Sequence, residues 1–351
     1  MVWYSFVGFH YDFEATKYIS EAHYFIENKS FSQSRYLFYF STIAIIALAL
    51  LLKLGLMGAI FIIMAINLFA YFYFFKALQK LVQSNFISLL LIVLLIGFFP
   101  YQSWTLFLYS ESIFYSMVLL LFSHLILFKQ IDFRFLFFTA LLLGVVVISR
   151  PLGILFVLPV LIFIYFHLTK KQKWFFYATI LVALVLLNYI VQVVFTTTPD
   201  WNMQRAIFEE SLICDVPGVT VPKKLEVVES SNQLYQLFYY ITHNFSHFSQ
   251  LAVKRLQLFF LLVRDYYTPL HNVYLLCYCI PIYIGIIWGF RRIKRVFSMP
   301  LFLFVFITIL LFAITIAIQC DDWHNRFYLT LMPLFFTAAV IGFTPKRFLL
   351  R

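Results

Sequence analysis

The segment that decides the fold is Leu301-Phe-Leu-Phe-Val-Phe-Ile-Thr-Ile-Leu-Leu-Phe-Ala-Ile-Thr-Ile-Ala-Ile318, which contains no charged residue. An uninterrupted apolar run of about 17 to 25 residues is long enough to cross a bilayer as a helix. The rest of the chain has the same character, because 63% of its 351 residues are hydrophobic, 12% are charged and the mean hydropathy is +0.91. The composition therefore excludes a soluble globular protein and predicts an all-α, polytopic membrane protein.

Similar apolar runs recur along the chain, and together they predict about nine transmembrane helices. The runs are Met57–Phe75, Phe86–Ser103, Ile113–Phe128, Phe133–Ile148, Leu152–Leu168, Trp174–Phe195, Asn272–Phe290, Leu301–Ile318 and Phe327–Phe343.

Short basic clusters separate these runs at every second connection, which is the pattern of cytoplasmic loops. The clusters are Lys76/Lys80, Lys129/Arg134, Lys170/Lys171/Lys173, Arg291/Arg292/Lys294/Arg295 and Lys346/Arg347/Arg351. Many of the 26 basic residues lie in these clusters, so the net charge of +11 does not make nucleic acid the expected partner. The opposite connections are expected to face outward and to hold all of the 15 acidic residues except Asp132.

The chain is expected to form one membrane domain over residues 1–351. Residues 1–39 are predicted to be a first extracytoplasmic loop, 40–54 a re-entrant or juxtamembrane helix too short to span, 57–195 helices, 196–271 a longer extracytoplasmic loop, and 272–351 the last helices. Within the longer loop, Leu251–Val263 is amphipathic and carries Lys254 and Arg255, which suits the lipid headgroup level. With this parity the N-terminus starts outside without a helix to deliver it. Either a transmembrane helix before Met1 is missing from the sequence, or the assigned parity is wrong.

The four cysteines give no disulfide framework by their spacing. Cys277 and Cys279 lie in an apolar run, whereas Cys214 and Cys320 are both expected on the outer side. A disulfide between Cys214 and Cys320 is one reading, but free thiols are favoured because spacing alone cannot assign connectivity.

Polar clusters lie where apolar runs meet the expected outer face, and charges at a membrane edge are costly unless they are paired, hydrated or used. They are Tyr109-Ser110-Glu111-Ser112, Ser149-Arg150-Pro151 and Asp321-Asp322-Trp323-His324-Asn325-Arg326-Phe327-Tyr328. In the first loop, Asp12, or with less support Glu14, is the candidate general base. The alternative is that Asp12, Glu14, Lys17 and Glu21 pair along a solvated helix.

Arginines at the same edge are candidates for binding a phosphate, because the arginine fork donates two hydrogen bonds. His271 offers a neutral or charged donor there, although a lone histidine is more often a structural hydrogen-bonder. The phosphate-binding candidates are Arg150, Arg264, His271, His324 and Arg326. Arg150 could instead extend to the lipid headgroups, and Arg326 could form a local ion pair with Asp321 and Asp322. An acceptor-binding or structural role is expected for Tyr18, Glu111, Asp321 and Asp322. Glu111 could bind the acceptor or an arginine, or equally cap its helix. No metal site is expected from histidine spacing, although a divalent cation held by Asp12 with Asp321 or Asp322 is left open.

The order of these motifs resembles that of integral-membrane glycosyltransferases of the GT-C superfamily. The resemblance rests on Asp12…Lys17-Tyr18-Ile19…Ala22…Phe31-Ser32…Tyr36, Tyr109-Ser110-Glu111-Ser112, Ser149-Arg150-Pro151-Leu152-Gly153 and Asn325-Arg326-Phe327-Tyr328…Pro333. Two of these, Tyr-Ser-Glu-Ser and Arg-Pro-x-Gly, look like elements of the GPI mannosyltransferase branch and of bacterial polyprenyl-phosphate-sugar transferases. The resemblance implies a catalytic Asp in the first extracytoplasmic loop, matched by Asp12, and a lipid-phosphate sugar donor. It also implies a transmembrane helix before that loop, whereas only eleven residues precede Asp12 here.

The expected function is sugar transfer from a polyprenyl-phosphate donor to a glycan, lipid or protein acceptor at the outer face of a membrane. In a bacterium this membrane is expected to be the inner membrane. A polyprenyl phosphate is a good leaving group, so one base and a few cations suffice, and no cofactor is expected. A transporter or flippase for an anionic or lipid-linked substrate is the alternative from another class. Ionisable residues near mid-span and broken helices in paired positions would favour it, and neither is evident in the sequence. A polysaccharide polymerase or ligase would share the same donor.

The alternating basic clusters generate a topology prediction. Single-cysteine variants at Asn202 and Asn232 should react with a membrane-impermeant thiol reagent added from outside, and a variant at Lys294 should not, because basic loops stay in the cytoplasm. Labelling of the Lys294 position from outside would overturn the whole topology.

Overall fold

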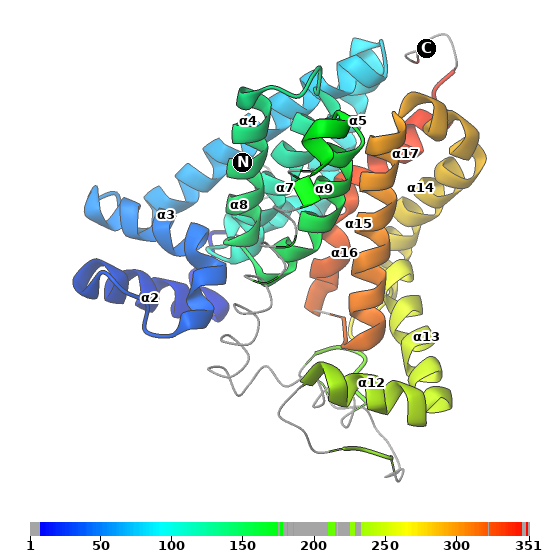
Figure 1. Ribbon diagram of the computed structural model, residues 1–351. Helices are drawn as coiled ribbons and strands as arrows, with labels where there is room; N and C mark the ends of the chain where they lie inside the picture. Colours follow the sequence, from blue (N-terminus) through cyan, green and yellow to red (C-terminus); the bar gives the residue numbers. More distant parts are fainter. Residues whose placement is uncertain are drawn as a thin grey trace. The chain divides into compact units, whose positions relative to one another are not determined.

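The computed structural model describes residues 8–174, 176–177, 181, 185, 210–214, 216, 225–228, 233–321, 323–345 and 349. Within these residues the regular secondary structure is helical, and β-structure is limited to isolated bridges such as the one between His10 and Phe107. The predicted all-α class is confirmed for this part of the chain (Figure 1).

The helices follow one another with short connections. The N-terminal series is α2 (Glu14–Asn28), η1 (Ser34–Tyr39), α3 (Phe40–Leu51), α4 (Gly55–Leu81), α5 (Asn85–Gly97), α6 (Phe99–Gln102), η2 (Ser103–Leu106), α7 (Ser110–Ile126), α8 (Phe133–Val147), η3 (Pro151–Phe156) and α9 (Val157–Tyr165). The C-terminal series is α12 (Gln233–His243), α13 (Phe245–Leu261), α14 (Pro269–Val296), α15 (Met299–Ile318), η4 (Trp323–Asn325), α16 (Arg326–Thr330) and α17 (Met332–Phe343).

Several of these helices are long and apolar enough to cross a membrane. Four qualify alone, and they are Ser34–Leu51, Gly55–Leu81, Pro269–Val296 and Met299–Ile318. Two pairs qualify only when joined, and each bends by more than 40° at a short break; they are Asn85–Gly97 with Phe99–Leu106 and Trp323–Thr330 with Met332–Phe343. Among the described residues the candidate spans therefore number four, or up to six if each bent pair is one span. This is compatible with a multi-pass membrane protein.

The predicted count of about nine spans is not confirmed by these helices. Three of the expected spans are helices of only 10–17 residues, namely Ser110–Ile126, Phe133–Val147 and Pro151–Tyr165. Most of the predicted span Trp174–Phe195 lies outside the described residues. The segment 40–54, expected to be re-entrant, contains α3, which together with η1 makes the candidate span Ser34–Leu51. The nine-span count and the re-entrant assignment stay predictions.

The chain divides into two compact units. The first consists of Met1–Asn188, Ile282–Thr308 and Thr330–Arg351, and the second of Tyr189–Pro281 and Ile309–Leu329. In the second unit α12 packs against α13, around a small cluster centred on Leu237 and Tyr240.

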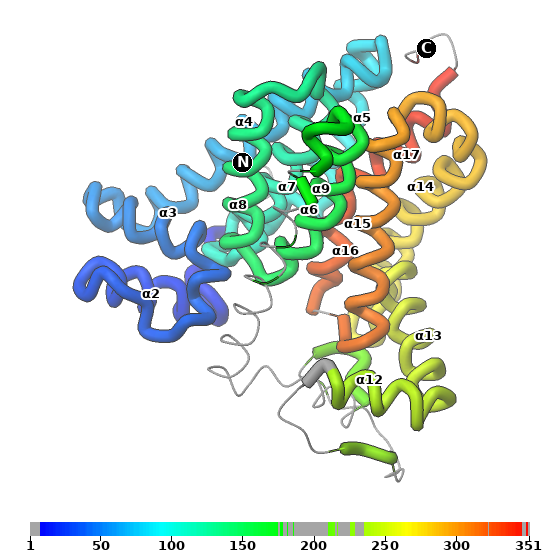
Figure 2. Tube along the Cα trace, in the orientation of Figure 1, coloured from blue at the N-terminus to red at the C-terminus, as the bar shows by residue number. Residues whose placement is uncertain are grey.

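Helix α7 lies at the centre of the first unit, because it buries every residue except Met117 and His124. It packs along α4 and against α8, while α3 packs against both α2 and α4 (Figure 2). A helix buried on all sides must satisfy its polar side chains within the protein. Ser116 of α7 does so by accepting a hydrogen bond of 3.0 Å from Asn67 of α4.

Helices α14 and α17 approach closely within the first unit, where Gly285, Gly289 and Gly342 face one another. A Cβ atom added to Gly289 would lie 2.0 Å from the Cα of Gly342, and one added to Gly342 would lie 1.9 Å from the carbonyl oxygen of Gly285. Gly285 and Gly289 form the G-x-x-x-G pattern that permits close helix contact in membranes. The absence of side chains therefore sets the distance between these two helices.

We expect Gly289→Ala to destabilise the protein by about 1–3 kcal/mol, because the new methyl group meets backbone and the helices must separate. The matched control is Gly144→Ala in α8, where an added Cβ meets nothing within 4 Å. That change should be neutral or stabilise by about 0.5–1 kcal/mol. Unfolding in detergent, followed by circular dichroism, compares the two, and equal effects would contradict the close crossing.

Candidate functional site

The segment before α2 is anchored to the turn between η2 and α7. His10 donates its backbone N–H to the Leu106 carbonyl at 3.1 Å and accepts from the Leu108 N–H at 3.3 Å. The Tyr109 hydroxyl donates to the backbone carbonyl of Asp12 at 3.3 Å. The Asp12 carboxylate is exposed and forms no hydrogen bond or ion pair with the residues that the structure describes. The predicted base is thus a solvated carboxylate on a backbone held by the Tyr-Ser-Glu-Ser cluster.

A chain of polar contacts runs from the start of α2 to the buried start of α7. The Glu14 carboxylate accepts from Lys17 at 2.9 Å and from the Tyr18 hydroxyl at 2.8 Å. The Tyr18 oxygen lies 3.4 Å from the Ser110 Oγ, and Ser110 donates to the Glu111 carboxylate at 3.2 Å. Burial, and next the Glu14 charge, raise the pKa of the Tyr18 hydroxyl well above its ordinary value. Tyr18 therefore keeps its proton and serves as a donor inside this chain.

The chain ends in a buried ion pair between Glu111 and Arg150. The Arg150 guanidinium donates to the Glu111 carboxylate at 2.6 Å, and the two side chains are 9% and 0% exposed. Arg150 points into the protein, so extension to the lipid headgroups is not what the structure shows. Glu111 lies in the first turn of α7, where a negative charge also interacts favourably with the helix dipole. The arginine-binding alternative for Glu111 is thus present, whereas Tyr109 and not Glu111 occupies the N-cap position of α7.

The turn Arg150-Pro151-Leu152-Gly153 depends on the absence of a side chain at residue 153. A Cβ atom there would lie 2.2 Å from the Val146 carbonyl oxygen. Gly153 donates its N–H to the Arg150 carbonyl at 2.8 Å, and Pro151 occupies the first position of η3. The motif therefore folds tightly against the end of α8, and this fold holds Arg150 beside Glu111.

The first loop pairs its charges differently from the expected helical ladder. Glu14 and Lys17 do pair, but Glu21 is buried and bonds to the backbone N–H of Ser32 at 2.8 Å and to its hydroxyl at 2.5 Å. Asp12 precedes α2 and takes no part in the ladder. Glu21 thus fixes the chain reversal after α2, a role that its spacing did not signal.

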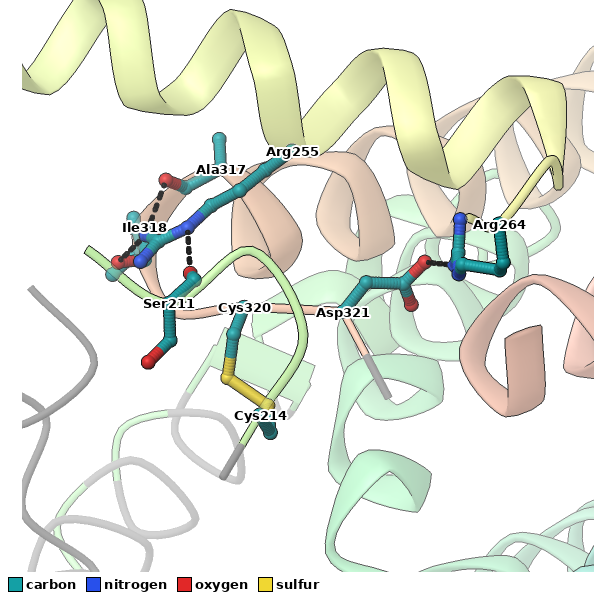
Figure 3. Close-up of a disulfide and its surroundings, with 8 residues drawn as sticks. All are labelled: Ser211, Cys214, Arg255, Arg264, Ala317, Ile318, Cys320 and Asp321. Atoms are coloured by element: carbon teal, nitrogen blue, oxygen red, sulfur yellow. Dashed lines mark hydrogen bonds and ion pairs between the residues drawn. A yellow bond between two sulfur atoms is a disulfide. The ribbon is translucent and has the colours of Figure 1, made fainter. Parts of the chain in front are cut away.

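The second unit holds another buried ion pair, between Arg264 and Asp321 (Figure 3). Both side chains are 0% exposed. Arg264 also donates to the carbonyls of Leu258 at 2.8 Å and Val263 at 3.1 Å, at the C-terminal end of α13, where a cation is favourable. Asp321 thus pairs with an arginine that is distant in the sequence. Asp322 lies outside the described residues, and Arg326 begins α16 and is partly buried.

Cys214 and Cys320 form a disulfide, with their Cα atoms 5.3 Å apart (Figure 3). The favoured prediction of free thiols is wrong for this pair. Cys277 and Cys279 are free thiols. The physical reason is a parallel bridge between Ile213 and Asp321, which brings the two segments together across 106 residues of sequence. Cysteine spacing carries no trace of that bridge.

Arg255 also differs from its predicted place at the lipid headgroups, because it is 0% exposed. It donates to the Ser211 carbonyl at 2.9 Å, and to the carbonyls of Ala317 at 3.3 Å and Ile318 at 2.9 Å at the end of α15 (Figure 3). Its neighbour Lys254 is exposed, as expected for the polar face of an amphipathic helix. The hydrophobic pattern of α13 could not have distinguished these two cations.

Two predicted imidazoles flank Tyr267 in the second unit. His324 is exposed, and its Nδ1 lies 3.3 Å from the Tyr267 hydroxyl. The His271 ring contacts the Tyr267 ring with a centroid distance of 4.3 Å. Burial is the main cause that raises the pKa of the Tyr267 hydroxyl, so this group is also a protonated donor. His271 and His324 are thus predicted phosphate-binding residues that lie beside a neutral hydroxyl rather than inside a buried ion pair.

The predicted site residues fall into two described groups. Asp12, Glu14, Tyr18, Glu111 and Arg150 belong to the first unit, and Arg264, His271, Asp321, His324 and Arg326 to the second. Among the described residues, no group of three or more His, Cys, Asp or Glu side chains could hold a metal ion.

Comparison of the chain with family models, with curated proteins and with solved structures finds no match.

The Glu111 and Arg150 pair generates a stability prediction. Arg150→Met should cost about 3–5 kcal/mol, because it leaves the Glu111 charge buried without compensation. The double variant Glu111→Leu/Arg150→Met should recover most of that loss, since no charge remains to be buried. Lys17→Met, which breaks the exposed pair with Glu14, should cost only about 0–1 kcal/mol. Denaturant unfolding in detergent gives the four values, and a double variant as unstable as Arg150→Met would contradict the pairing.

Proposed function

We propose that the protein is an integral-membrane glycosyltransferase that moves a sugar from a polyprenyl-phosphate donor to an acceptor. The observation that carries the proposal is the polar chain from Glu14 through Tyr18, Ser110 and Glu111 to Arg150. It joins three segments that the sequence singles out separately, and it leaves the Asp12 carboxylate solvated beside them. An exposed carboxylate that lies next to a set of buried, hydrogen-bonded side chains is held in place by them. This supports a catalytic role for Asp12.

In the proposed reaction Asp12 removes a proton from the acceptor hydroxyl as that oxygen attacks the anomeric carbon of the donor. The bond between the sugar and the phosphate oxygen breaks, and polyprenyl phosphate leaves with the bonding electrons. A phosphate leaves without an added proton, so a second carboxylic acid of the kind used by glycosidases is not required. Glu14 is a poorer candidate for the base, because Lys17 and Tyr18 already occupy its carboxylate.

The departing phosphate needs positive charge or hydrogen-bond donors. In the first unit, which carries Asp12, the proposal assigns this role to Arg150, which would exchange its carboxylate partner for phosphate oxygens. Arg264, His271, His324 and Arg326 belong to the second unit and are proposed as phosphate-binding residues of that unit. Tyr18, Glu111 and Asp321 then act by holding the arginines and the first loop, and the role proposed for Asp322 lies outside the described residues. No cofactor is invoked, and a divalent cation at Asp12 is left to experiment.

The disulfide supports an extracytoplasmic location for its part of the chain, because disulfides persist in oxidising compartments. This agrees with the basic clusters, which assign the same segments to the outer side. The proposed location is therefore a membrane such as the bacterial inner membrane, with the reaction on its outer face. A glycan, a lipid or a protein would serve as the acceptor.

A transporter or flippase for an anionic or lipid-linked substrate is the second candidate, and one observation favours it. Helices α5 and α6–η2 bend by 72° at a short break, and broken helices are a feature of many transporters. Broken helices in paired positions, which the sequence does not make evident, stay a prediction of this second candidate. A flippase would move a lipid-linked sugar across a vesicle membrane without releasing polyprenyl phosphate, which distinguishes it from the enzyme. A polymerase or ligase would release the lipid carrier like the transferase and differs only in its acceptor.

Asp12→Asn should lower the rate of sugar transfer by about a hundredfold to ten-thousandfold, the usual effect of removing a general base. Donor binding and thermal stability should be almost unchanged, because the carboxylate is solvated. Glu14→Gln is the matched comparison in the same loop and should be much milder. Transfer is measured as release of polyprenyl phosphate from a radiolabelled donor, and equal behaviour of the two variants would remove Asp12 from its role.

A further inference from the structure

Two adjacent residues, His324 and Asn325, have left-handed backbone conformations, with φ of 56° and 59°. Side-chain-bearing residues rarely adopt this conformation, and it persists only where the surrounding structure imposes it. Asn325 is buried, whereas His324 is exposed. The turn therefore presents an imidazole to solvent in a strained conformation that other contacts must maintain.

Contacts on the C-terminal side of α13 hold the turn itself. The Asn325 amide donates to the Leu262 carbonyl at 2.9 Å. The His324 backbone N–H donates to the Tyr266 hydroxyl at 3.2 Å. These two bonds fix the turn against residues that follow α13, within the second unit.

A second set of contacts fastens the chain just before the turn (Figure 3). Asp321 donates its N–H to the Leu212 carbonyl at 2.9 Å and accepts from the Cys214 N–H at 2.8 Å. The adjacent Cys320 is covalently bonded to Cys214, and the Asp321 side chain is paired with Arg264. Asp321 is thus held through its backbone, its side chain and its covalent neighbour.

Arg255 is buried in the second unit and joins the segment that contains Ser211 to the end of α15. Its guanidinium donates to Ser211 on one segment and to Ala317 and Ile318 on the other, so one side chain joins the two segments that the disulfide also joins. Burial lowers the pKa of Arg255 to about 10, so the group is still charged at neutral pH. We name the disulfide together with Arg255 the clamp.

We propose that the clamp is a positioning device, which keeps the strained turn in the conformation that presents His324 to the donor phosphate. The ligand named here rests on the proposed function, but the hold of the clamp on the turn does not. Asp12 and the first unit play no part in it.

The structural test uses the Cys277→Ala/Cys279→Ala variant, whose remaining cysteines, Cys214 and Cys320, form the clamp disulfide. A dithiol reductant gives two electrons and two protons to the disulfide, which becomes two thiols, while the reductant becomes a cyclic disulfide. Thiol labelling confirms complete reduction. Hydrogen exchange at the amides of Cys214 and Asp321 should then accelerate by about tenfold or more, as in local opening. The control is the amide of Val82 at the C-terminal end of α4, whose exchange rate should not change. Unchanged exchange of both amides after full reduction would overturn the proposal.

Arg255→Met and Lys254→Met form a matched pair that leaves the disulfide intact. Arg255→Met should accelerate exchange at the same two amides, because it unlinks Ser211 from the end of α15. Lys254→Met should not, since that side chain is exposed. Equal exchange in the two variants would remove Arg255 from the clamp.

The functional test measures binding of a polyprenyl phosphate in detergent micelles to oxidised and reduced protein, with and without His324→Ala. Reduction and His324→Ala should each weaken binding by about tenfold, as for loss of one charge-assisted hydrogen bond. The two effects should not add, because both remove the same contact. Additive losses, or a His324→Ala variant that binds normally, would overturn the positioning role. Failure of the proposed function is distinguishable, because oxidised wild-type protein would then bind no polyprenyl phosphate while the exchange results still report on the clamp.

Discussion

The ion pair between Glu111 and Arg150 is the constraint on which the first unit depends. A charge buried in a protein interior is tolerated only when it is paired and hydrogen-bonded, so both partners must arrive in register. Several features serve that requirement. Helix α7 begins at Ser110, the glycine at 153 lets the Arg150 turn lie against the end of α8, and Tyr18 delivers a hydrogen bond from α2. The first loop is tied to the helices through this pair and through the backbone contacts of His10.

The second unit uses the same physical solution in another place. Arg264 and Asp321 are buried together, and Arg255 satisfies the carbonyl groups at the end of α15 while the disulfide closes the surrounding chain. In each unit a rigid, paired interior lies next to an exposed ionisable group, which is Asp12 in the first and His324 in the second. An exposed ionisable group on a backbone that is held by buried contacts is suited to catalysis or binding, because it is accessible to a ligand and keeps a fixed position. This parallel is the physical basis for proposing a reaction rather than a surface role.

Some of this arrangement could be predicted from the sequence, and the difference between success and failure is physical. The helices and the polar clusters at their ends follow from local composition, which one chain displays directly. Binding of Glu111 to an arginine was one of several readings, because a carboxylate in a first helical turn also suits the helix dipole, and the sequence did not identify Arg150 as the partner. The disulfide was the less favoured of two readings, because it depends on a backbone bridge between segments 106 residues apart in the chain. The burial of Arg255 and the contact of Gly289 with Gly342 likewise depend on distant segments, which the hydrophobic pattern of one helix does not reveal. The bends between paired helices were not predicted from that pattern either.

The measurement that tests the central claim most directly incubates purified, oxidised protein in lipid vesicles with a panel of polyprenyl-phosphate sugars. The account predicts that at least one donor loses its sugar and that free polyprenyl phosphate accumulates in step with a glycosylated acceptor. Movement of intact lipid-linked sugar between the leaflets, without release of polyprenyl phosphate from any donor, would contradict it.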